Sequence, residues 1–381
     1  MRFGDICKFQ SGGTPSKNES AYYNGNIPWI TTVALNGDFI TDSDAVDWIT
    51  EKAIKESAAK IVPENSIMVG TRVGVGKVGI NKIPMSTSQD IISLLGINEC
   101  EWYKPYLCKC LQSKSAYLNS QARGATIKGI KIDVLASLEI SELSIEEQKN
   151  ISFLFDTLTS LISLRKQQLA KLDELVKARF VELFGDVALN PNGYPVKDFD
   201  EISVLITDGE HATPRRTEEG IYLLSARNVL NHTLQLDDVD YIDEEEYNRI
   251  ARRVIPQAGD VLISCSGSIG RCCVVPDGLK FQMVRSAALI RFDDTINPIF
   301  AEWLITSDDL QRQIAQSATQ SSQANLFQGK IRKLHGYVPP MKLQNQFAAF
   351  VEQTDKSKSA IQQNLDKLET LKGALMQKYF G

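Results

Sequence analysis

The stretch that decides the fold is Leu169-Ala-Lys-Leu-Asp-Glu-Leu175, which runs on to Phe184-Gly185. It returns near the end of the chain as Leu365-Asp-Lys-Leu-Glu-Thr-Leu371, running on to Phe380-Gly381, at a constant offset of 196 residues. Similarity at a fixed offset indicates that one structural unit occurs more than once. The sequence therefore predicts two divergent copies of one unit, each taking about half of the 381 residues.

Two matches upstream support the duplication. Ile61-Val-Pro63 corresponds to Val254-Ile-Pro256, at an offset of 193 residues. The two halves also begin alike, because Phe3-Gly-Asp-Ile6 corresponds to Phe199-Asp-Glu-Ile202. The small changes in offset predict short insertions between matching elements.

Each copy is predicted to contain a strand-rich globular part followed by one long helix. Short β-type runs bounded by turn residues predict strands at 66–71 and 260–265. Helical patterns follow later in each copy, at 103–121 and 298–317. The predicted boundaries are a first globular domain at 1–143, a first long helix at 144–185, a linker with the second globular domain at 186–341, and a second long helix at 342–381.

Apolar residues of the two long helices follow a heptad pattern, interrupted in the first helix at Arg165 and Gln168. Alternating steps of three and four residues are typical of a coiled-coil seam. Ser144, with Glu147 three residues later, predicts a capping box at the start of the first helix. The predicted seam consists of Ile151, Leu154, Leu158, Leu161, Leu172 and Leu175 in the first helix, and of Phe347, Val351, Ile361, Leu365, Leu368 and Leu375 in the second.

Neither helix is apolar all round, so each requires a partner. The alternative, packing on its own domain, needs an apolar face about 60 Å long, which few domains of this size have. The predicted fold class is therefore α+β: two globular α/β domains joined by two long antiparallel helices that form an intramolecular coiled coil, with a pseudo-two-fold internal repeat.

The composition is that of an ordinary globular protein, with 43% hydrophobic and 23% charged residues and a net charge of −5. No run approaches the roughly 20 apolar residues of a membrane span, and the first residues lack the apolar core of a secretion signal. We expect a soluble, cytoplasmic protein. Seven cysteines without CxxC spacing and only three histidines predict reduced thiols and no metal site. Mild acidity does not exclude a local basic face that binds nucleic acid.

Candidate catalytic motifs fail on their context. Gly74-Val-Gly-Lys-Val-Gly79 satisfies GxGxxG, but no βαβ unit surrounds it and the residues that follow cannot open a helix. The run Gly70–Lys77 is one residue too long for a P-loop, so glycines in a tight β-turn are the favoured interpretation. Val338-Pro-Pro-Met341 lacks the polar and aromatic neighbours of an amino-methyltransferase loop, and His211 and His335 have no nucleophile at an informative spacing. We predict no catalytic residue.

Polar and basic residues occupy matching places in both copies. Arg can read guanine edges with two hydrogen bonds, Asn and Gln can read adenine, and Lys and Arg neutralise phosphate. Lys77 and Arg271 correspond most closely, because each follows the same glycine at the same strand exit. The candidate DNA contacts are Lys17, Arg72, Lys77, Lys82 and Gln89 in the first copy, and Arg215, Arg216, Arg227, Asn228, Arg271 and Arg285 in the second.

The motifs of both copies resemble a known family. Ser11-Gly-Gly-Thr-Pro-Ser16 and then Tyr22-Tyr-Asn-Gly-Asn-Ile-Pro-Trp-Ile30 resemble the opening of target recognition domains in the specificity (S) subunits of type I restriction-modification systems. The second copy, with Asp208-Gly-Glu-His-Ala-Thr-Pro214 and Gly220-Ile-Tyr-Leu-Leu-Ser-Ala-Arg-Asn228, is similar to another common version of this domain. The helices that end in Leu-Phe-Gly and Tyr-Phe-Gly are similar to the conserved-region helices of the family.

The resemblance implies a non-catalytic subunit in which each recognition domain reads one half of a bipartite DNA target and the helix pair sets the spacer. The unlike copies predict an asymmetric target. The implied partners are double-stranded DNA, two modification (methyltransferase) subunits docked on the helices, and restriction (nuclease-translocase) subunits. S-adenosylmethionine would be bound by the modification subunits, which methylate adenine N6, and this chain would bind no cofactor. A DNA-binding regulator or decoy without modification partners, or an enzyme whose distant residues converge, are the alternatives.

Overall fold

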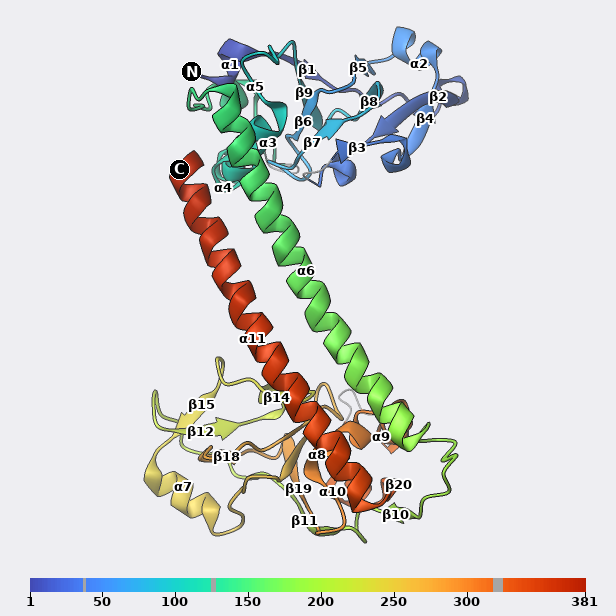
Figure 1. Ribbon diagram of the computed structural model, residues 1–381, viewed down its shortest axis with the longest axis vertical. Coiled ribbons are helices and arrows are strands. Elements are labelled where there is room, and N and C mark those ends of the chain that lie inside the picture. The colour runs from blue at the N-terminus through green and yellow to red at the C-terminus, as the bar shows by residue number, and fades with distance from the viewer. Residues whose placement is uncertain (37–38, 125–127, 318–324) are drawn as a thin grey trace. The chain divides into compact units, whose positions relative to one another are not determined.

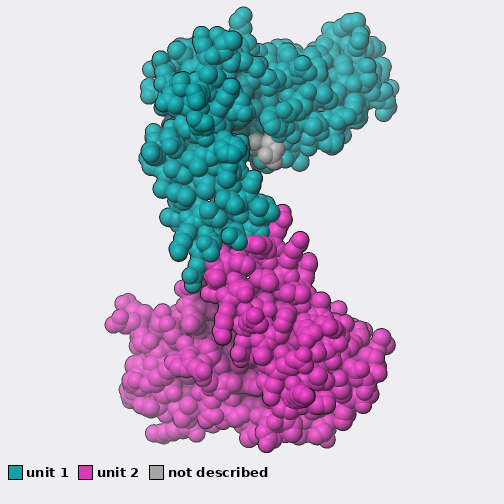
Figure 2. All heavy atoms as spheres, viewed as in Figure 1, with its two compact units in different colours: residues 1–166, 363–381 teal, residues 167–362 magenta. Residues whose placement is uncertain are grey.

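A computed structural model describes residues 1–381 except 37–38, 125–127 and 318–324. It divides into two compact units: unit 1 comprises residues 1–166 and 363–381, and unit 2 comprises residues 167–362 (Figure 2). Both long helices, α6 (Ile145–Phe184) and α11 (Met341–Phe380), have 40 residues and contribute to both units (Figure 1). The predicted boundaries divide the chain differently, because they separate the globular parts from the long helices. These boundaries stay a prediction.

Unit 1 contains two mixed sheets. The first has the order β1 (Lys8–Ser11), β9 (Ile91–Leu95), β6 (Ile67–Gly70), β7 (Val78–Asn81) and β3 (Phe39–Ile40), and only the pair β7–β3 is parallel. The second has the order β4 (Asp47–Ile49), β2 (Tyr23–Ile30), β8 (Met85–Thr87) and β5 (Ile61–Val62), with β2 and β8 parallel. Strand β6 confirms the strand predicted at 66–71, and its unbroken apolar run fits its burial on both faces.

Unit 2 has sheets of closely similar order. An antiparallel sheet runs β11 (Ser203–Asp208), β19 (Ala287–Phe292), β16 (Val261–Ser264) and β17 (Cys272–Val274). A second sheet runs β15 (Asp240–Ile242), β12 (Ile221–Leu224) and β18 (Phe281–Met283), and β12 and β18 are parallel, as β2 and β8 are in unit 1. Two two-stranded antiparallel sheets complete the unit: β10 (Val196–Asp198) with β20 (His335–Tyr337), and the hairpin of β13 (Val229–Leu230) with β14 (Thr233–Leu234).

Short helices lie in the globular part of each unit. Both predicted helical stretches are confirmed, each as two consecutive helices: α3 (Lys104–Ser113) with α4 (Ser115–Gln121), and α8 (Pro298–Ile305) with α9 (Asp308–Ser317). The remaining helices are α1 (Phe3–Ile6), α2 (Glu51–Glu56) and α5 (Ile132–Ala136) in unit 1, and α7 (Glu244–Ala251) and α10 (Gln328–Ile331) in unit 2.

Aromatic side chains of both long helices enter the core of each unit. In unit 1 the ring of Phe380 lies 5.5 Å from the rings of Tyr106 and Phe155. In unit 2 the ring of Phe347 lies 5.3 Å from Phe180 and 5.6 Å from Phe184. These contacts join the start of one long helix to the end of the other, so within each unit the two helices pack antiparallel.

Ion pairs follow the same antiparallel pairing. Lys166 Nζ lies 2.8 Å from a carboxylate oxygen of Glu369 in unit 1, and Lys358 Nζ lies 2.7 Å from Asp173 in unit 2. The predicted capping box of α6 is confirmed, because Ser144 N donates to Glu147 Oε2 at 2.9 Å and Glu147 N donates to Ser144 Oγ at 3.3 Å.

The buried row of α6 differs from the predicted seam at two positions. Leu161 and Leu175 are 39% and 49% exposed, while their neighbours Ile162 and Val176 face inward. From Leu158 the inward face continues by a step of four residues rather than three, which moves the apolar row by one position. The predicted residues of α11 all lie on its buried or half-buried side: Phe347, Val351, Ile361, Leu365, Leu368 and Leu375.

A membrane-spanning helix and a metal-binding cluster are both absent from the described residues. None of the helices there combines the length and the apolar character needed to cross a membrane. Outside the three gaps in the description, no group of three or more His, Cys, Asp or Glu side chains is arranged to hold a metal ion.

Candidate nucleic-acid interface

The hairpin between β6 and β7 carries two of the predicted contacts. Gly70 N donates to Lys77 O at 2.8 Å, and Gly76 N donates to Gly70 O at 3.0 Å. Gly76 has a φ of +79°, and a Cβ added there would lie 2.7 Å from Ser115 Oγ. Glycine is needed here both for the left-handed backbone and for the close approach of α4. The interpretation of the GxGxxG run as a tight β-turn is confirmed.

The hairpin between β16 and β17 in unit 2 has the same backbone. Ser264 N donates to Arg271 O at 2.8 Å, and Gly270 N donates to Ser264 O at 2.9 Å. Gly270 has a φ of +83°, and a Cβ added there would lie 2.9 Å from Gln311 Oε1. These hydrogen bonds repeat those of unit 1 at an offset of 194 residues.

The tips of the two hairpins carry different side chains. In unit 1 the tip is Arg72-Val73-Gly74, with Val73 56% exposed. The equivalent tip in unit 2 is Ser266-Gly267-Ser268. One backbone arrangement therefore presents a cation and an apolar group in one unit, and small neutral residues in the other.

The corresponding cations at the hairpin exits have different surroundings. Lys77 is exposed. Arg271 is half-buried, and its Nη2 donates to Ala226 O at 3.0 Å. Its Nε is buried and has no hydrogen-bond partner within the described parts of the chain. The structure thus attaches Arg271 to a neighbouring loop and leaves Lys77 at the surface.

The glycine motifs that carried the family resemblance lie where two backbones cross. A Cβ added to Gly12 would lie 2.2 Å from Ser88 O, and one added to Gly209 would lie 2.4 Å from the backbone of Val284. In unit 1 the crossing is also fixed by Trp29, whose Nε1 donates to the next glycine of the motif at 3.0 Å. Any side chain at these glycines would force the strands apart.

The other candidates in unit 1 are at the surface. Lys17 and Gln89 are exposed. Lys82 Nζ lies 3.4 Å from the ring centroid of Phe39, a cation–π geometry. Gln89 directly precedes Asp90, whose backbone oxygen accepts from Thr71 N at 2.8 Å next to Arg72.

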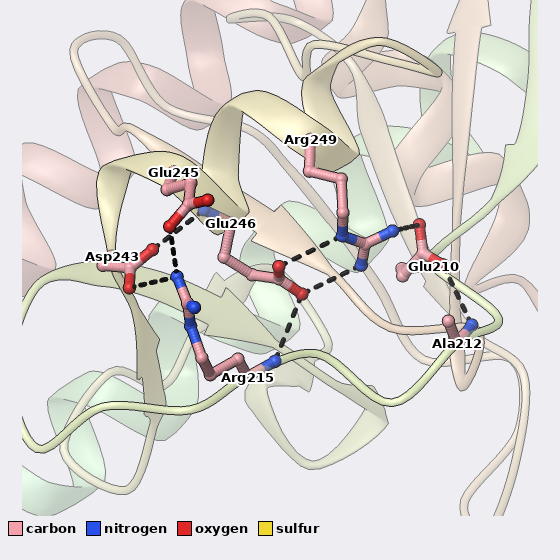
Figure 3. Close-up of polar contacts among 7 residues, drawn as sticks. All are labelled: Glu210, Ala212, Arg215, Asp243, Glu245, Glu246 and Arg249. Atoms are coloured by element: carbon pink, nitrogen blue, oxygen red, sulfur yellow. Dashed lines mark hydrogen bonds and ion pairs between the residues drawn. The ribbon is translucent and has the colours of Figure 1, made fainter.

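Arg215 in unit 2 is held by carboxylates. Its Nη2 lies 2.8 Å from both Asp243 and Glu245, and its backbone N–H donates to Glu246 at 3.1 Å (Figure 3). The hydrogen bond to Glu245 and the charge of Asp243 raise the pKa of Arg215. In Figure 3 Arg249 holds the other side of Glu246, so this loop is fixed against α7.

Arg216 and Arg227 are also paired with acids, since both approach Asp240 at 3.1 Å. Asn228 is only 1% exposed and donates to the backbone oxygens of Gln235 and Asp238. In this structure Asn228 therefore organises a loop and has no surface to offer to a base edge. Arg285 is exposed, and within the described part of the chain its side chain forms no ion pair.

Sequence reasoning missed two cations that join Arg72. Arg123 and Lys131 line, with Arg72, a surface hollow of about 560 Å³ in unit 1. They are 50 or more residues from Arg72 in the chain and meet it because Ile130 N donates to Thr71 O at 2.8 Å. This contact has no signal in the sequence.

Comparison with known proteins finds a family match in the first part of the chain. Residues 1–174 match the family described as the type I restriction modification DNA specificity domain. Residues 1–174 are thus similar to this specificity domain. The resemblance read from the first copy is thereby confirmed, and the hairpin β6–β7, the glycine crossing of unit 1 and the hollow all lie within the matched residues.

Two relatives similar to part of this chain are type I specificity subunits. The chain is 34% identical over 186 residues to the type I restriction enzyme MjaIX specificity subunit of Methanocaldococcus jannaschii, covering 48% of this chain and 42% of that protein. It is 31% identical over 170 residues to the EcoR124I/EcoR124II specificity subunit of Escherichia coli, covering 42% of this chain and 41% of the relative. The matched part thus spans about two fifths of each relative.

Two solved structures resemble the fold of the whole chain, beyond residues 1–174. The S subunit of a type I restriction-modification system from M. genitalium superposes with a TM-score of 0.62 at 15% identity, covering 100% of this chain and 95% of that one. A chain from a structural study of complex assembly in a type I system gives a TM-score of 0.64 at 16% identity, covering 100% and 96%. At these identities the likeness concerns the fold alone.

Proposed function

We propose that this chain is the DNA-specificity subunit of a type I restriction-modification complex, and that each unit contacts one half of an asymmetric bipartite target in duplex DNA. The observation that carries the proposal is the pair of hairpins with the same backbone and different tips. A shared backbone presents its tip to DNA in the same way, while different side chains select different bases. Unlike tips therefore favour unlike half-sites.

The paired helices α6 and α11 would act as the spacer between the half-sites. Antiparallel contacts within each unit, such as Lys166–Glu369 and Lys358–Asp173, support an intramolecular coiled coil. Two readers on one scaffold fix the distance between half-sites. The second contact is then intramolecular, so two modest affinities combine.

The helices would also dock two modification subunits, and restriction subunits would join the same complex. Phe153, Leu161 and Leu164 are exposed along one face of α6 in unit 1, and exposed apolar side chains that gather on one face are typical of protein interaction sites. In this proposal the modification subunits bind S-adenosylmethionine and methylate adenine N6. This chain supplies recognition, and its partners supply the chemistry.

The test is co-expression with a cognate modification subunit, followed by mapping of N6-methyladenine across the host genome by single-molecule sequencing. We expect one new motif with two unlike halves and a fixed spacer. A soluble complex that methylates no motif would favour the DNA-binding regulator or decoy instead. Failure of the two proteins to associate would contradict the proposal.

A single substitution at one hairpin tip tests the assignment of half-sites. Val73→Gly places at the tip of unit 1 the residue found at the equivalent position of unit 2, Gly267. We expect relaxed or altered specificity in one half of the methylated motif and an unchanged second half and spacer, because an apolar side chain can select thymine through its methyl group. An unchanged motif would remove this hairpin from the reading surface.

A further inference from the structure

The hollow lined by Arg72, Arg123 and Lys131 gathers three cations on one surface of unit 1. Its rim also includes Gln121, and Ile130 and Val134 contribute apolar lining. Like charges on one small surface repel each other unless anions offset them. The balance of charge around this hollow therefore indicates what it binds.

Acidic neighbours do not provide that balance. Arg72 Nη1 lies 4.0 Å from Asp90, at the outer limit of an ion pair, and Asp90 does not line the hollow. Within the described residues, neither Arg123 nor Lys131 forms an ion pair with a carboxylate. The cations of unit 2 show the contrast, since Arg215, Arg216 and Arg227 are all paired with acids.

The backbone holds these cations in place. Arg123 and Gly129 exchange two backbone hydrogen bonds, of 2.9 and 3.0 Å. A Cβ on Gly129 would lie 2.9 Å from Arg72 Cγ, so this glycine leaves room for the arginine stem. Ile130, one residue before Lys131, is bonded to the strand exit at Thr71. The three side chains thus start from one connected backbone frame.

Unit 2 has an equivalent backbone contact, but its described residues at the positions of Arg72 and Lys131 are not cations. Leu326 N donates to Cys265 O at 2.8 Å, the counterpart of the bond from Ile130 to Thr71. Ser266 then stands where unit 1 has Arg72, and Phe327, which is 57% exposed, stands where unit 1 has Lys131. The cationic hollow is therefore a feature of unit 1 and not a requirement of the fold.

We propose that this hollow binds a phosphate of the DNA backbone beside the half-site of unit 1, and that the two units share the phosphate contacts unequally. The inference rests on the proposed function and adds to it the residues that supply affinity rather than base selection. Guanidinium and ammonium groups bind phosphate oxygens by charge-assisted hydrogen bonds. Each phosphate they neutralise releases counterions, which makes binding depend on salt.

The test compares the full chain with the double variant Arg123→Gln, Lys131→Gln on a random-sequence DNA duplex, by fluorescence anisotropy over a range of salt concentrations. We expect binding about tenfold weaker at 0.1 M salt, and a slope of log K against log salt that is shallower by about 0.9, for one lost phosphate contact. Arg123→Lys, Lys131→Arg keeps both charges and should keep the slope.

The matched control is Lys149→Gln, Lys367→Gln, which removes the same charge from exposed lysines of the long helices. If the wild type binds duplex DNA and the hollow variant has the affinity and slope of this control, the inference is wrong and the proposed function stands. If the wild type binds no duplex, the proposed function itself fails. Saturable binding of inorganic phosphate in this hollow, without an effect of the variant on DNA, would overturn the assignment to DNA.

Discussion

Asn228 holds the loop after β12 through its amide group. Its Oδ1 accepts from Ser225 N at 2.9 Å, and its Nδ2 donates to Gln235 O at 3.0 Å and to Asp238 O at 2.9 Å. The loop therefore has its shape because one buried side chain satisfies three backbone groups. The equivalent residue of unit 1 is Ala34, which closes the same type of short 3₁₀ turn without such bonds.

Asn228→Ala should lower the stability of unit 2 by about 3 kcal/mol, because it leaves buried backbone groups without partners. Differential scanning calorimetry of the full chain would show the loss as a lower unfolding temperature. The methylated motif should keep its bases, since Asn228 has no access to DNA. An unchanged unfolding temperature together with a changed motif would restore Asn228 as a base contact.

Side-chain type alone suggested contacts for these residues but could not identify their partners. Asn228 and Arg215 have the chemistry of base and phosphate readers, yet one is buried in a loop and the other is paired with Asp243 and Glu245. The acids that pair with Arg215 are nearly 30 residues away in sequence. Only the fold brings them together, so such partners could not be predicted.

At the scale of elements, the heptad pattern predicted that α6 packs against a partner helix. It did not predict correctly which residues of α6 lie on the packed side. Ile151 and Leu158 are buried as the pattern requires, whereas Leu161 is replaced on the inner side by Ile162. Because Leu161 and Ile162 are both apolar, the pattern allows either of them to face inward, and only the packing of the folded chain selects Ile162. The strands of β6 and β16 were predictable because their apolar runs are short and bounded by turns.

Leu158→Ala and Leu161→Ala distinguish these two phases. Leu158 is only 4% exposed, so its truncation should cost about 2–5 kcal/mol. Leu161→Ala should change the free energy of unfolding by no more than about 0.5 kcal/mol, as is usual at the surface. Chemical denaturation with both variants checks the expectation. A larger loss for Leu161→Ala would restore the predicted seam.

The capping box of α6 gives a pH-dependent prediction. Hydrogen bonds from Ser144 lower the pKa of Glu147 below its ordinary value of 4.5. The contribution of Glu147 to stability is therefore fully present above pH 4.5 and is lost as the pH falls through the lowered value. Ser144→Ala should cost about 1 kcal/mol at neutral pH. In denaturation series at falling pH, the difference from wild type should shrink; a constant difference would contradict this role of Glu147.

At the scale of the whole molecule, the offset of 196 residues predicted two units of similar build, and both contain a sheet with the same antiparallel core of four strands. Each compact unit includes the end of the long helix of the other copy: residues 363–381 in unit 1 and 167–184 in unit 2. The antiparallel pairing was predicted, but the points at which the compact units divide each helix were not, because they depend on packing against the globular parts.

An insertion tests the proposed spacer. Seven residues added to α6 before Leu169, with seven added at the matching level of α11 to keep the pair in register, lengthen the helices by about 10 Å. We expect the spacer of the methylated motif to grow by about 3 base pairs at 3.4 Å per step. Both halves of the motif should stay the same. A spacer of unchanged length would show that the helices do not set it.

The divided composition of unit 1 has a consequence for biosynthesis. Translation delivers the chain from its N-terminus, and domains generally fold as units while they emerge from the ribosome. Unit 2 is one continuous segment, 167–362, whereas unit 1 also requires residues 363–381, including Phe380, which covers Tyr106 and Phe155. Unit 2 can therefore be complete before unit 1, although unit 1 begins first along the chain. Until Phe380 has been made, the nascent N-terminal half keeps an apolar surface open at Tyr106 and Phe155, and transiently exposed surfaces of this kind are prone to aggregate.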